Sequence, residues 1–393
     1  MSYTIGVVAF SVGLLLSVML HEAGHFTTAK AYGMKASRFF VGFGPTLWSF
    51  RRGETEYGIK ALPFGGFVKL DGMTSIEEIA PEDEPRAFYK QPAGKRTVVL
   101  AAGSVVHFII TIVLLFGVLA ATGQDPIRTA GVQIAQVEKC LTPAADGSCA
   151  GAPTSPAYGV LQAGDVLLSV NGTKVTGSGD NFANILHKSA GTPATIVYER
   201  DGQTHTTTLT PQPTKVGKIN EGRIGVETEL RAAHVSVGGA FGRTFTLMGS
   251  FISSTGHAIT AIPHEVHQVF AGQQRGGNEP ASIVDVARVS GQISSSGGGI
   301  GDIVASLLLI LAELNLFVGL FNLLPLLPLD GGHIAIIGFE KARTGIYRVI
   351  GRRDPGRVDI MKVLPLTYAV VAAFVGLSVI LLYAGITNPI RLQ

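Results

Sequence analysis

An H-E-A-G-H motif occupies residues 21–25 of the sequence. On a helix, His21 and His25 are about one turn apart and share a face, so their imidazoles can hold one divalent cation. Glu22 lies between them and is placed to take a proton from a water molecule that the cation activates. Imidazole ligands at this spacing suit Zn²⁺. The motif therefore predicts a Zn²⁺ site that has its own general base.

A catalytic zinc ion needs a third protein ligand and an open position for water. Asp330, in the sequence N-L-L-P-L-L-P-L-D-G-G at 322–332, is the candidate for that ligand. Pro325 and Pro328 are expected to end the preceding helix and to leave irregular backbone beside the site. The alternative for Asp330 is a turn residue at a helix end, before two glycines.

Four apolar segments are long enough to cross a bilayer, which takes about 20 residues of helix. We expect transmembrane helices at 1–28, 97–123, 303–332 and 364–386. The alternative for the first segment, a cleaved signal peptide, lacks basic residues before the apolar run and an A-x-A site after it. Only 15% of the residues are charged, which argues against an ordinary soluble enzyme. The net charge of +3, without a block of like charge, gives no reason to expect nucleic acid as a partner.

The basic residues lie outside these apolar segments. Connection 26–96 contains 11 of them and connection 326–363 contains 7, whereas the much longer connection 124–302 contains 12. Because basic residues concentrate on the cytoplasmic side, connections 26–96 and 326–363 are predicted to be cytoplasmic, and connection 124–302 and both termini extracytoplasmic. The H-E-A-G-H motif and Asp330 then lie at the inner ends of helices that run in the same direction. The site is therefore expected near the cytoplasmic side of the cell membrane.

The combination of these two motifs resembles the site-2 protease family of intramembrane zinc metalloproteases. The resemblance implies a Zn²⁺-dependent endopeptidase that acts within the lipid bilayer. It also implies that His21, His25 and Asp330 bind the zinc ion, that Glu22 is the general base, and that Asn322 contacts the substrate backbone. For Asn322, a helix-packing amide is an equally simple interpretation. The implied substrates are single-span membrane proteins already cut outside the membrane, such as anti-sigma factors or signal-peptide remnants.

The second apolar segment departs from the family pattern. Where the family has A-G-P-x-x-N, this sequence has A-G-S-V-V-H at 102–107, so that His107 takes the position of the asparagine. We expect His107 to form a hydrogen bond across the helix bundle. A role as a fourth metal ligand is less compatible with catalysis, because a fourth protein ligand would close the position for water.

Segment 36–70 alternates aromatic and polar residues and is interrupted by glycine and proline, which predicts short strands and hairpins. It resembles the membrane-re-entrant β-loop of site-2 proteases, in particular at 63–69. An exposed strand edge in this loop would be able to pair with an unwound substrate segment. The alternative is a plain cytoplasmic hairpin.

The region between the second and third apolar segments has a different pattern. Short alternating runs with Asn171-Gly172 and Asp201-Gly202 turns predict a small mixed α+β domain at 129–213. The sequence L-Q-A-G-D-V-L-L-S-V-N-G at 161–172 resembles a PDZ domain, which would either bind a substrate tail or obstruct bulky proteins. An amphipathic region and a flexible Gly/Ser-rich tether are expected at 214–302.

Both cysteines of the chain, Cys140 and Cys149, fall in this outer region, where disulfides persist. A bridge between them would close a short loop, and the alternative is two unrelated thiols.

The expected fold is thus a multi-pass α-helical membrane protein with about four transmembrane helices, a membrane-associated β-hairpin loop and an extracytoplasmic PDZ domain. Two other functions are also compatible with these motifs. A membrane metal carrier or metal sensor would use the ligands without needing Glu22. An inactive PDZ scaffold would need neither Glu22 nor Asp330, and the presence of both argues against it.

Overall fold

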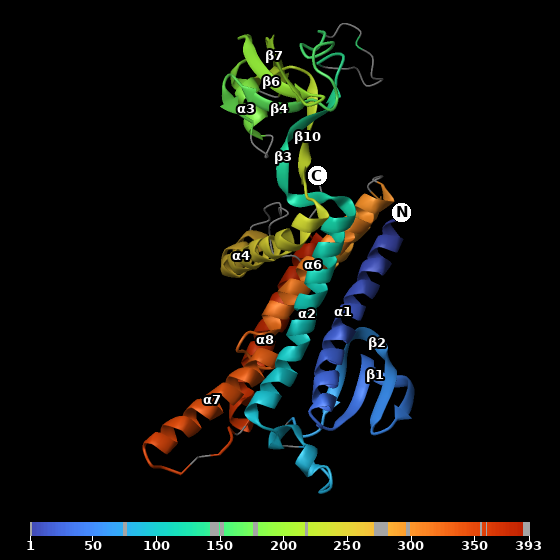
Figure 1. The fold of residues 1–393 in the computed structure, drawn as a ribbon, viewed down its shortest axis with the longest axis vertical. Helices are drawn as coiled ribbons and strands as arrows, with labels where there is room; N and C mark the ends of the chain where they lie inside the picture. Colours follow the sequence, from blue (N-terminus) through green and yellow to red (C-terminus); the bar gives the residue numbers. More distant parts are fainter. Residues whose placement is uncertain are drawn as a thin grey trace. The chain divides into compact units, whose positions relative to one another are not determined.

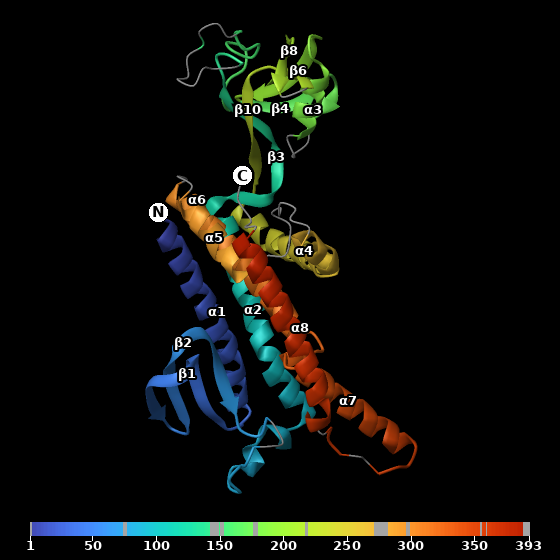
Figure 2. The same ribbon diagram turned by 180° about the vertical axis from the view of Figure 1, so that it is seen from behind.

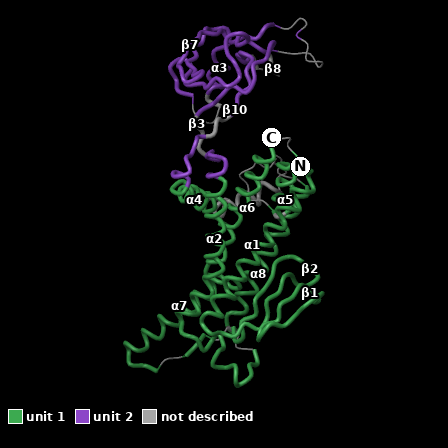
Figure 3. Tube along the Cα trace, turned by 45° about the vertical axis from the view of Figure 1, so that its right-hand side comes forward, with its two compact units in different colours: residues 1–118, 241–393 green, residues 119–240 purple. Residues whose placement is uncertain are grey.

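The computed structural model describes residues 2–73, 77–141, 149, 153–175, 180–216, 219–270, 282–295, 299–353, 356–358 and 360–387. They form two compact units (Figure 3). The first unit consists of 1–118 and 241–393, and the second of 119–240.

Four helices in the described part of the chain are long and apolar enough to cross a membrane. They are α1 (Tyr3–Ala31), α2 (Ala93–Thr122), α6 (Ile300–Asn322) and α8 (Ile360–Thr387). Figure 1 shows them as long neighbouring helices. They cover the four apolar segments that the sequence predicts.

Helix α1 is packed along one face. Its buried residues include Phe10, Ser17, His21 and Gly24, whose three- to seven-residue spacing places them on a single stripe. A Cβ atom at Gly24 would lie 2.9 Å from the carbonyl oxygen of Ala102 in α2, so a glycine is needed where the two helices meet. Small residues at such a contact let two membrane helices approach closely.

Helix α6 ends at Asn322, before the predicted boundary at residue 332 but in agreement with the helix break expected at Pro325 and Pro328. Pro325 and Pro328 lack the backbone N–H groups that a continuing helix needs. A new helix, α7, begins at Asp330 and ends at Val349. A Cβ atom at Gly331 would lie 2.3 Å from the carbonyl carbon of Leu323, so the glycine allows α7 to begin directly against the preceding turn.

Helix α4 (Val237–Phe270) occupies the part of 214–302 where an amphipathic region is predicted. The predicted tether is wrong at residues 290–295, which belong to helix α5 (Ile283–Ser295) rather than to a flexible segment. Helix α5 packs between α1 and α8 (Figure 2). Ser294 of α5 donates a hydrogen bond to the Ser2 carbonyl oxygen at 3.0 Å, which connects α5 to the start of α1. The glycine-rich part at 271–281 lies outside the described residues.

The predicted β-loop is present as strands β1 (Ala36–Arg52) and β2 (Thr55–Leu70). The two long strands bend back on themselves. Phe39 of β1, for example, pairs with Val68 on one side and with Tyr57 on the other, and both partners belong to β2. This sheet packs on α1, where a Cβ atom at Gly66 would lie 2.4 Å from the sulfur of Met19.

A cluster of ion pairs fixes the turn between β1 and β2 to the end of α1. Glu54 in this turn pairs with Lys30 of α1 and with Arg86. Arg86 lies in the short 3₁₀ helix η1 (Glu84–Arg86), which is followed by η2 (Phe88–Lys90). Its Nε also donates to the Gly33 carbonyl oxygen at 3.0 Å. The hydrogen bond from Arg86, together with Lys30, lowers the pKa of Glu54 from its ordinary value of 4.5 to about 2.

The second unit contains a sheet with the strand order β10-β3-β4-β6-β7, in which β5 also pairs with β4. A separate pair, β8 and β9, lies in the same unit. The strands are β3 (Gln124–Val137), β4 (Val166–Val170), β5 (Thr173–Lys174), β6 (Ala194–Arg200), β7 (Gln203–Leu209), β8 (Gln212–Val216), β9 (Ile219–Arg223) and β10 (Val226–His234). Helix α3 (Asp180–Lys188) adds Phe182 and Leu186 to the core.

Both predicted hairpin turns are present in this unit. Asn171 and Gly172 have φ values of 49° and 77°, and Asp201 and Gly202 have φ values of 50° and 77°. Two consecutive positive φ angles are what a tight two-residue hairpin requires, and Asn-Gly and Asp-Gly tolerate them.

The compact unit extends beyond the predicted domain boundaries of 129–213. Strand β10 pairs with β3 from Val226↔Val137 to His234↔Gln124, so residues before 129 and after 213 belong to the same sheet. Cys140 and Cys149 are joined by a disulfide with a Cα–Cα distance of 5.8 Å.

We expect Glu54→Gln to lower the free energy of unfolding by about 1 kcal/mol at neutral pH, because it removes the charge that pairs with Lys30 and Arg86. A carboxylate with a lowered pKa stabilises the fold above its ordinary value of 4.5, and this contribution is lost as the pH falls toward about 2. Thermal unfolding of the detergent-solubilised protein should therefore show a difference that shrinks over this range. Glu82→Gln is the control, since Glu82 is exposed and has no ion pair among the described residues. Equal unfolding midpoints for both variants at neutral pH would contradict the assignment.

Candidate metal centre

Three side chains that are distant in the sequence converge at one point. The Nε2 atoms of His21 and His25 are 3.0 Å apart. Oδ2 of Asp330 lies 3.5 Å from the first and 3.3 Å from the second. Helix α1 supplies the two imidazoles from its buried stripe, and the first residue of α7 supplies the carboxylate. The structure thus brings together the three residues that the sequence nominates as ligands.

These separations fit a tetrahedral zinc site. Ligand atoms about 2.0 to 2.1 Å from a tetrahedral Zn²⁺ are roughly 3.3 Å from one another. The observed separations of 3.0, 3.3 and 3.5 Å bracket that value. The donor set of two nitrogens and one carboxylate oxygen is also one that zinc accepts with a fourth position left open.

The tautomer of His25 is set by a backbone group. Its Nδ1 donates a hydrogen bond to the carbonyl oxygen of Val99 in α2, at 2.7 Å. The Nε2 of the neutral ring then carries the lone pair that a metal ion needs. The Nδ1 of His21 is buried and has no hydrogen-bond partner among the described residues.

Close contact between α1 and α2 also fixes the ring of His21. A Cβ atom at Gly103 of α2 would lie 2.4 Å from Cε1 of His21. The imidazole therefore lies directly on the backbone of α2, and only a glycine leaves it room.

Glu22 lies at the edge of the β1–β2 sheet. Its Oε2 accepts a hydrogen bond of 3.0 Å from the backbone N–H of Val68 in β2. Oε1 has no hydrogen-bond partner among the described residues. One oxygen of the carboxylate is thus held by the sheet, and the other is available for a proton.

His107 takes part in a polar network inside the helix bundle. Asn315 of α6 donates from Nδ2 to the carbonyl oxygen of Leu311 at 2.7 Å and to Oγ of Ser17 at 3.1 Å. Its Oδ1 is therefore the acceptor for Nδ1 of His107, at 2.8 Å. The ring centroid of His107 is 4.9 Å from that of His21, but His107 is not one of the three residues whose ligand atoms converge.

Asn322 is the last residue of α6 and is half-buried. It lies at the end of the helix that leads through residues 323–329 to Asp330. Its side chain has no hydrogen bond to another described residue.

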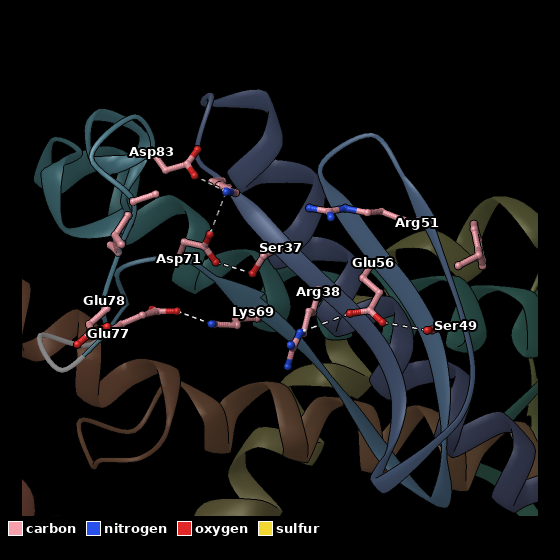
Figure 4. Close-up of a pocket in the computed structure, with 14 residues that line it drawn as sticks. Ser37, Arg38, Ser49, Arg51, Glu56, Lys69, Asp71, Glu77, Glu78 and Asp83 are labelled. Carbon is pink, nitrogen blue, oxygen red and sulfur yellow. Dashed lines mark hydrogen bonds and ion pairs between the residues drawn. The ribbon is translucent and has the colours of Figure 1, made fainter.

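A polar cavity of about 580 Å³ lies away from the three converging residues. It opens over β1, β2 and the segment that follows them (Figure 4). Most of its charges pair with one another, as Lys69 does with Glu77, Arg38 with Glu56, and Lys35 with both Asp71 and Asp83. This cavity is therefore part of the framework that holds the β1–β2 sheet, and the metal centre does not contribute to its lining.

Sequence patterns did not reveal three groups at the site. The Val99 carbonyl and the Val68 N–H are backbone groups, and their side chains carry no signal for such a role. Asn315 did have a signal, since an amide inside an apolar spanning helix is costly and is usually retained for a reason.

We expect Gly103→Ala to weaken metal binding roughly 10- to 100-fold, because the added methyl group displaces the ring of His21. Gly117→Ala is the matched control in the same helix, since a Cβ atom there meets nothing within 4 Å. Metal bound per chain, titrated against a competing chelator, measures the difference. Equal affinities in the two variants would show that α2 does not fix His21.

Comparison with known proteins identifies the family. The sequence profile of peptidase family M50 matches residues 9–351. The zinc metalloprotease Rip1 of Mycolicibacterium smegmatis is 36% identical over 415 residues, which cover all of both chains. The protein of the same name from Mycobacterium tuberculosis is 36% identical over 410 residues, again along both full lengths. The chloroplastic membrane metalloprotease ARASP of Arabidopsis thaliana is 27% identical and covers 84% of this chain and 69% of its own.

Among solved structures, the PDZ domain of an SdrC-like protein from Listeria monocytogenes covers 26% of this chain and 93% of its own. Its identity is 20% and its TM-score is 0.20, which is too low to support a fold assignment for the second unit. The family assignment rests instead on the profile and on the relatives that align along the whole chain. The resemblance to site-2 proteases is thereby confirmed, and the chain belongs to peptidase family M50.

Proposed function

We propose that this protein cleaves peptide bonds within the transmembrane segments of other membrane proteins. It is a zinc metalloprotease of a membrane-protease family. The observation that carries the proposal is the convergence of His21, His25 and Asp330, next to Glu22, in a chain with four helices able to span a membrane. In this proposal the three converging residues bind the zinc ion and Glu22 is the general base.

The zinc ion, when bound, supplies a Lewis acid that polarises the scissile carbonyl and makes water more acidic. Glu22 accepts a proton from the attacking water and returns it to the leaving amine nitrogen. The Val68 N–H holds Oε2 of Glu22, so that Oε1 remains free to take this proton. Burial of both imidazoles keeps bulk water from competing for the ligand atoms.

The β1–β2 sheet has a role in presenting the substrate in this proposal. A helical segment must unwind before its peptide bonds are accessible, and an unwound segment can pair with a strand edge. Because β2 donates a hydrogen bond to Glu22, a segment paired beside β2 would pass close to the general base. Asn322, at the end of α6, is proposed to contact the backbone of the same segment.

Region 129–213 is proposed to be the main part of an extracytoplasmic PDZ domain, with both termini on the same side and the site near the cytoplasmic side. The higher density of basic residues in 26–96 and 326–363 supports this orientation. The proposed substrates are single-span proteins such as anti-sigma factors or signal-peptide remnants, after a first cut outside the membrane.

A metal carrier or sensor and an inactive scaffold are less well supported. Neither would need a glutamate whose carboxylate is held 3.0 Å from a backbone donor beside the ligands. The decisive test is cleavage of a helical membrane substrate by the purified protein in lipid vesicles, with and without a zinc chelator. Chelation should abolish cleavage, and added zinc should restore it. A protein that contains zinc but leaves every such substrate intact would point to the carrier or the scaffold.

We expect Glu22→Gln to keep its zinc content and to lower the cleavage rate by at least about a hundredfold, because the amide cannot accept the proton of the attacking water. Glu313→Gln is the matched control, since Glu313 lies in spanning helix α6, away from the three converging residues. Its rate should be that of the parent protein. Zinc stoichiometry and product formation are measured on the same preparations. A parent-like rate in Glu22→Gln would overturn the assigned role.

A further inference from the structure

Helix α7 carries an exposed apolar stripe that no described part of the chain covers. Its members are Ala335, Phe339, Ala342, Ile346 and Val349, spaced alternately by four and three residues, which places them on one face. Phe339 is 59% exposed, Ile346 60% and Val349 87%. Figures 1 and 2 show α7 extending away from the four spanning helices. A stripe of this kind on an isolated helix indicates a missing apolar partner.

The opposite side of α7 is already in use. Ile337 is buried in the core at the end of α1 and α2, and Glu340 forms an ion pair of 3.2 Å with Arg96 of α2. Glu340 also accepts a hydrogen bond of 2.9 Å from the N–H of Val358. Because these contacts fix the inner face, the apolar stripe cannot turn inward.

The polar surface beside the stripe is basic. Residues 331–353 contain five basic side chains and one acidic one. The acidic residue is Glu340, whose charge is already paired with Arg96. Lys341, Arg343 and Arg348 belong to α7, and Arg352 and Arg353 follow directly after its end at Val349. The face that surrounds the stripe therefore suits an anionic partner.

The position of α7 in the chain identifies that partner. Helix α6 ends at Asn322 and α8 begins at Ile360, and both are long and apolar enough to span a membrane. Spanning helices end at the surface of the bilayer, so the short connection that contains α7 is held at that surface. An apolar stripe flanked by basic residues is the pattern of a helix that lies in the lipid interface.

We propose that α7 is an interfacial helix that binds anionic phospholipids. The apolar stripe inserts among the acyl chains, and Lys341, Arg348 and Arg352 bind the lipid phosphates of the same leaflet. This lipid binding does not depend on the proposed protease function. One consequence does rest on it: Asp330 is the first residue of α7, so lipid bound along the helix helps to orient the proposed third zinc ligand.

The test uses the full-length protein in vesicles with bromine-labelled acyl chains on either phosphatidylglycerol or phosphatidylcholine. Cys140 and Cys149 are joined in a disulfide, so one added cysteine provides the thiol for a fluorescent label. Labels at Ile346→Cys, in the stripe, and at Arg348→Cys, on the polar side, report where the helix lies. We expect the bromines to quench the label at 346 much more strongly than the label at 348. Equal weak quenching at both positions would overturn the insertion.

Lipid preference is tested with the label at 346. Brominated phosphatidylglycerol should quench it more than brominated phosphatidylcholine. Lys341→Gln with Arg352→Gln should lower that preference about fivefold for each charge removed. The control removes two exposed charges from the second unit, Lys139→Gln with Lys188→Gln, and should leave the preference unchanged. Equal quenching by both lipids in the parent protein would overturn the preference for anionic lipid.

A second copy of the chain is the other possible occupant of the stripe. Spin labels at position 346 would then show dipolar coupling between two chains in dilute vesicles, together with little quenching by lipid bromines. That result would overturn the lipid proposal and would show that the stripe forms a contact between two copies of the chain. Neither measurement depends on cleavage activity, so failure of this proposal and failure of the proposed protease function are distinguishable.

Discussion

The arrangement of this protein depends on bringing three electron-pair donors together inside an apolar bundle. Two imidazole nitrogens and a carboxylate oxygen lie within 3.5 Å of one another, where burial makes mutual repulsion and lost hydration costly. A bound divalent cation, as we propose here, would remove that penalty, because it would interact favourably with all three donors at once. The surrounding helices therefore have to be held firmly enough to keep His21, His25 and Asp330 converged.

Close contacts between helix backbones hold the helices in these positions. Gly24 and Gly103 let α1 and α2 approach until the ring of His21 lies on the α2 backbone and His25 reaches the Val99 carbonyl. Gly331 does the same for α7, whose first turn packs against the carbonyl of Leu323 and so places Asp330. Between helices surrounded by lipid there is no hydrophobic driving force for association. Small residues at these contacts allow close van der Waals packing, which stabilises the contacts instead.

Two peripheral elements are attached to this centre by their ends. The β1–β2 sheet contacts Glu22 through the Val68 N–H and is held at its far turn by Glu54, which pairs with Lys30 and Arg86. Helix α7 begins at Asp330, one of the three converging residues, and continues outward with an exposed apolar stripe. Each element therefore connects the site to a surface that other molecules can contact. In our proposals, the sheet binds peptide and the helix binds lipid.

The sequence by itself determined the four spanning helices, the H-E-A-G-H and Asp330 motifs and both hairpin turns, because these depend on local hydrophobicity, fixed helical spacing and the backbone freedom of Asn-Gly and Asp-Gly. It did not determine that α6 stops at Asn322 and that α7 restarts at Asp330, or that residues 290–295 form a helix against α1. Only the tertiary structure decided which backbone groups serve the site. The Val99 carbonyl bonds His25, and the Val68 N–H bonds Glu22. Gly103 leaves room for the ring of His21. All three have these roles only because of where they lie. Every residue carries the same backbone groups, so their roles arise only when distant segments pack together.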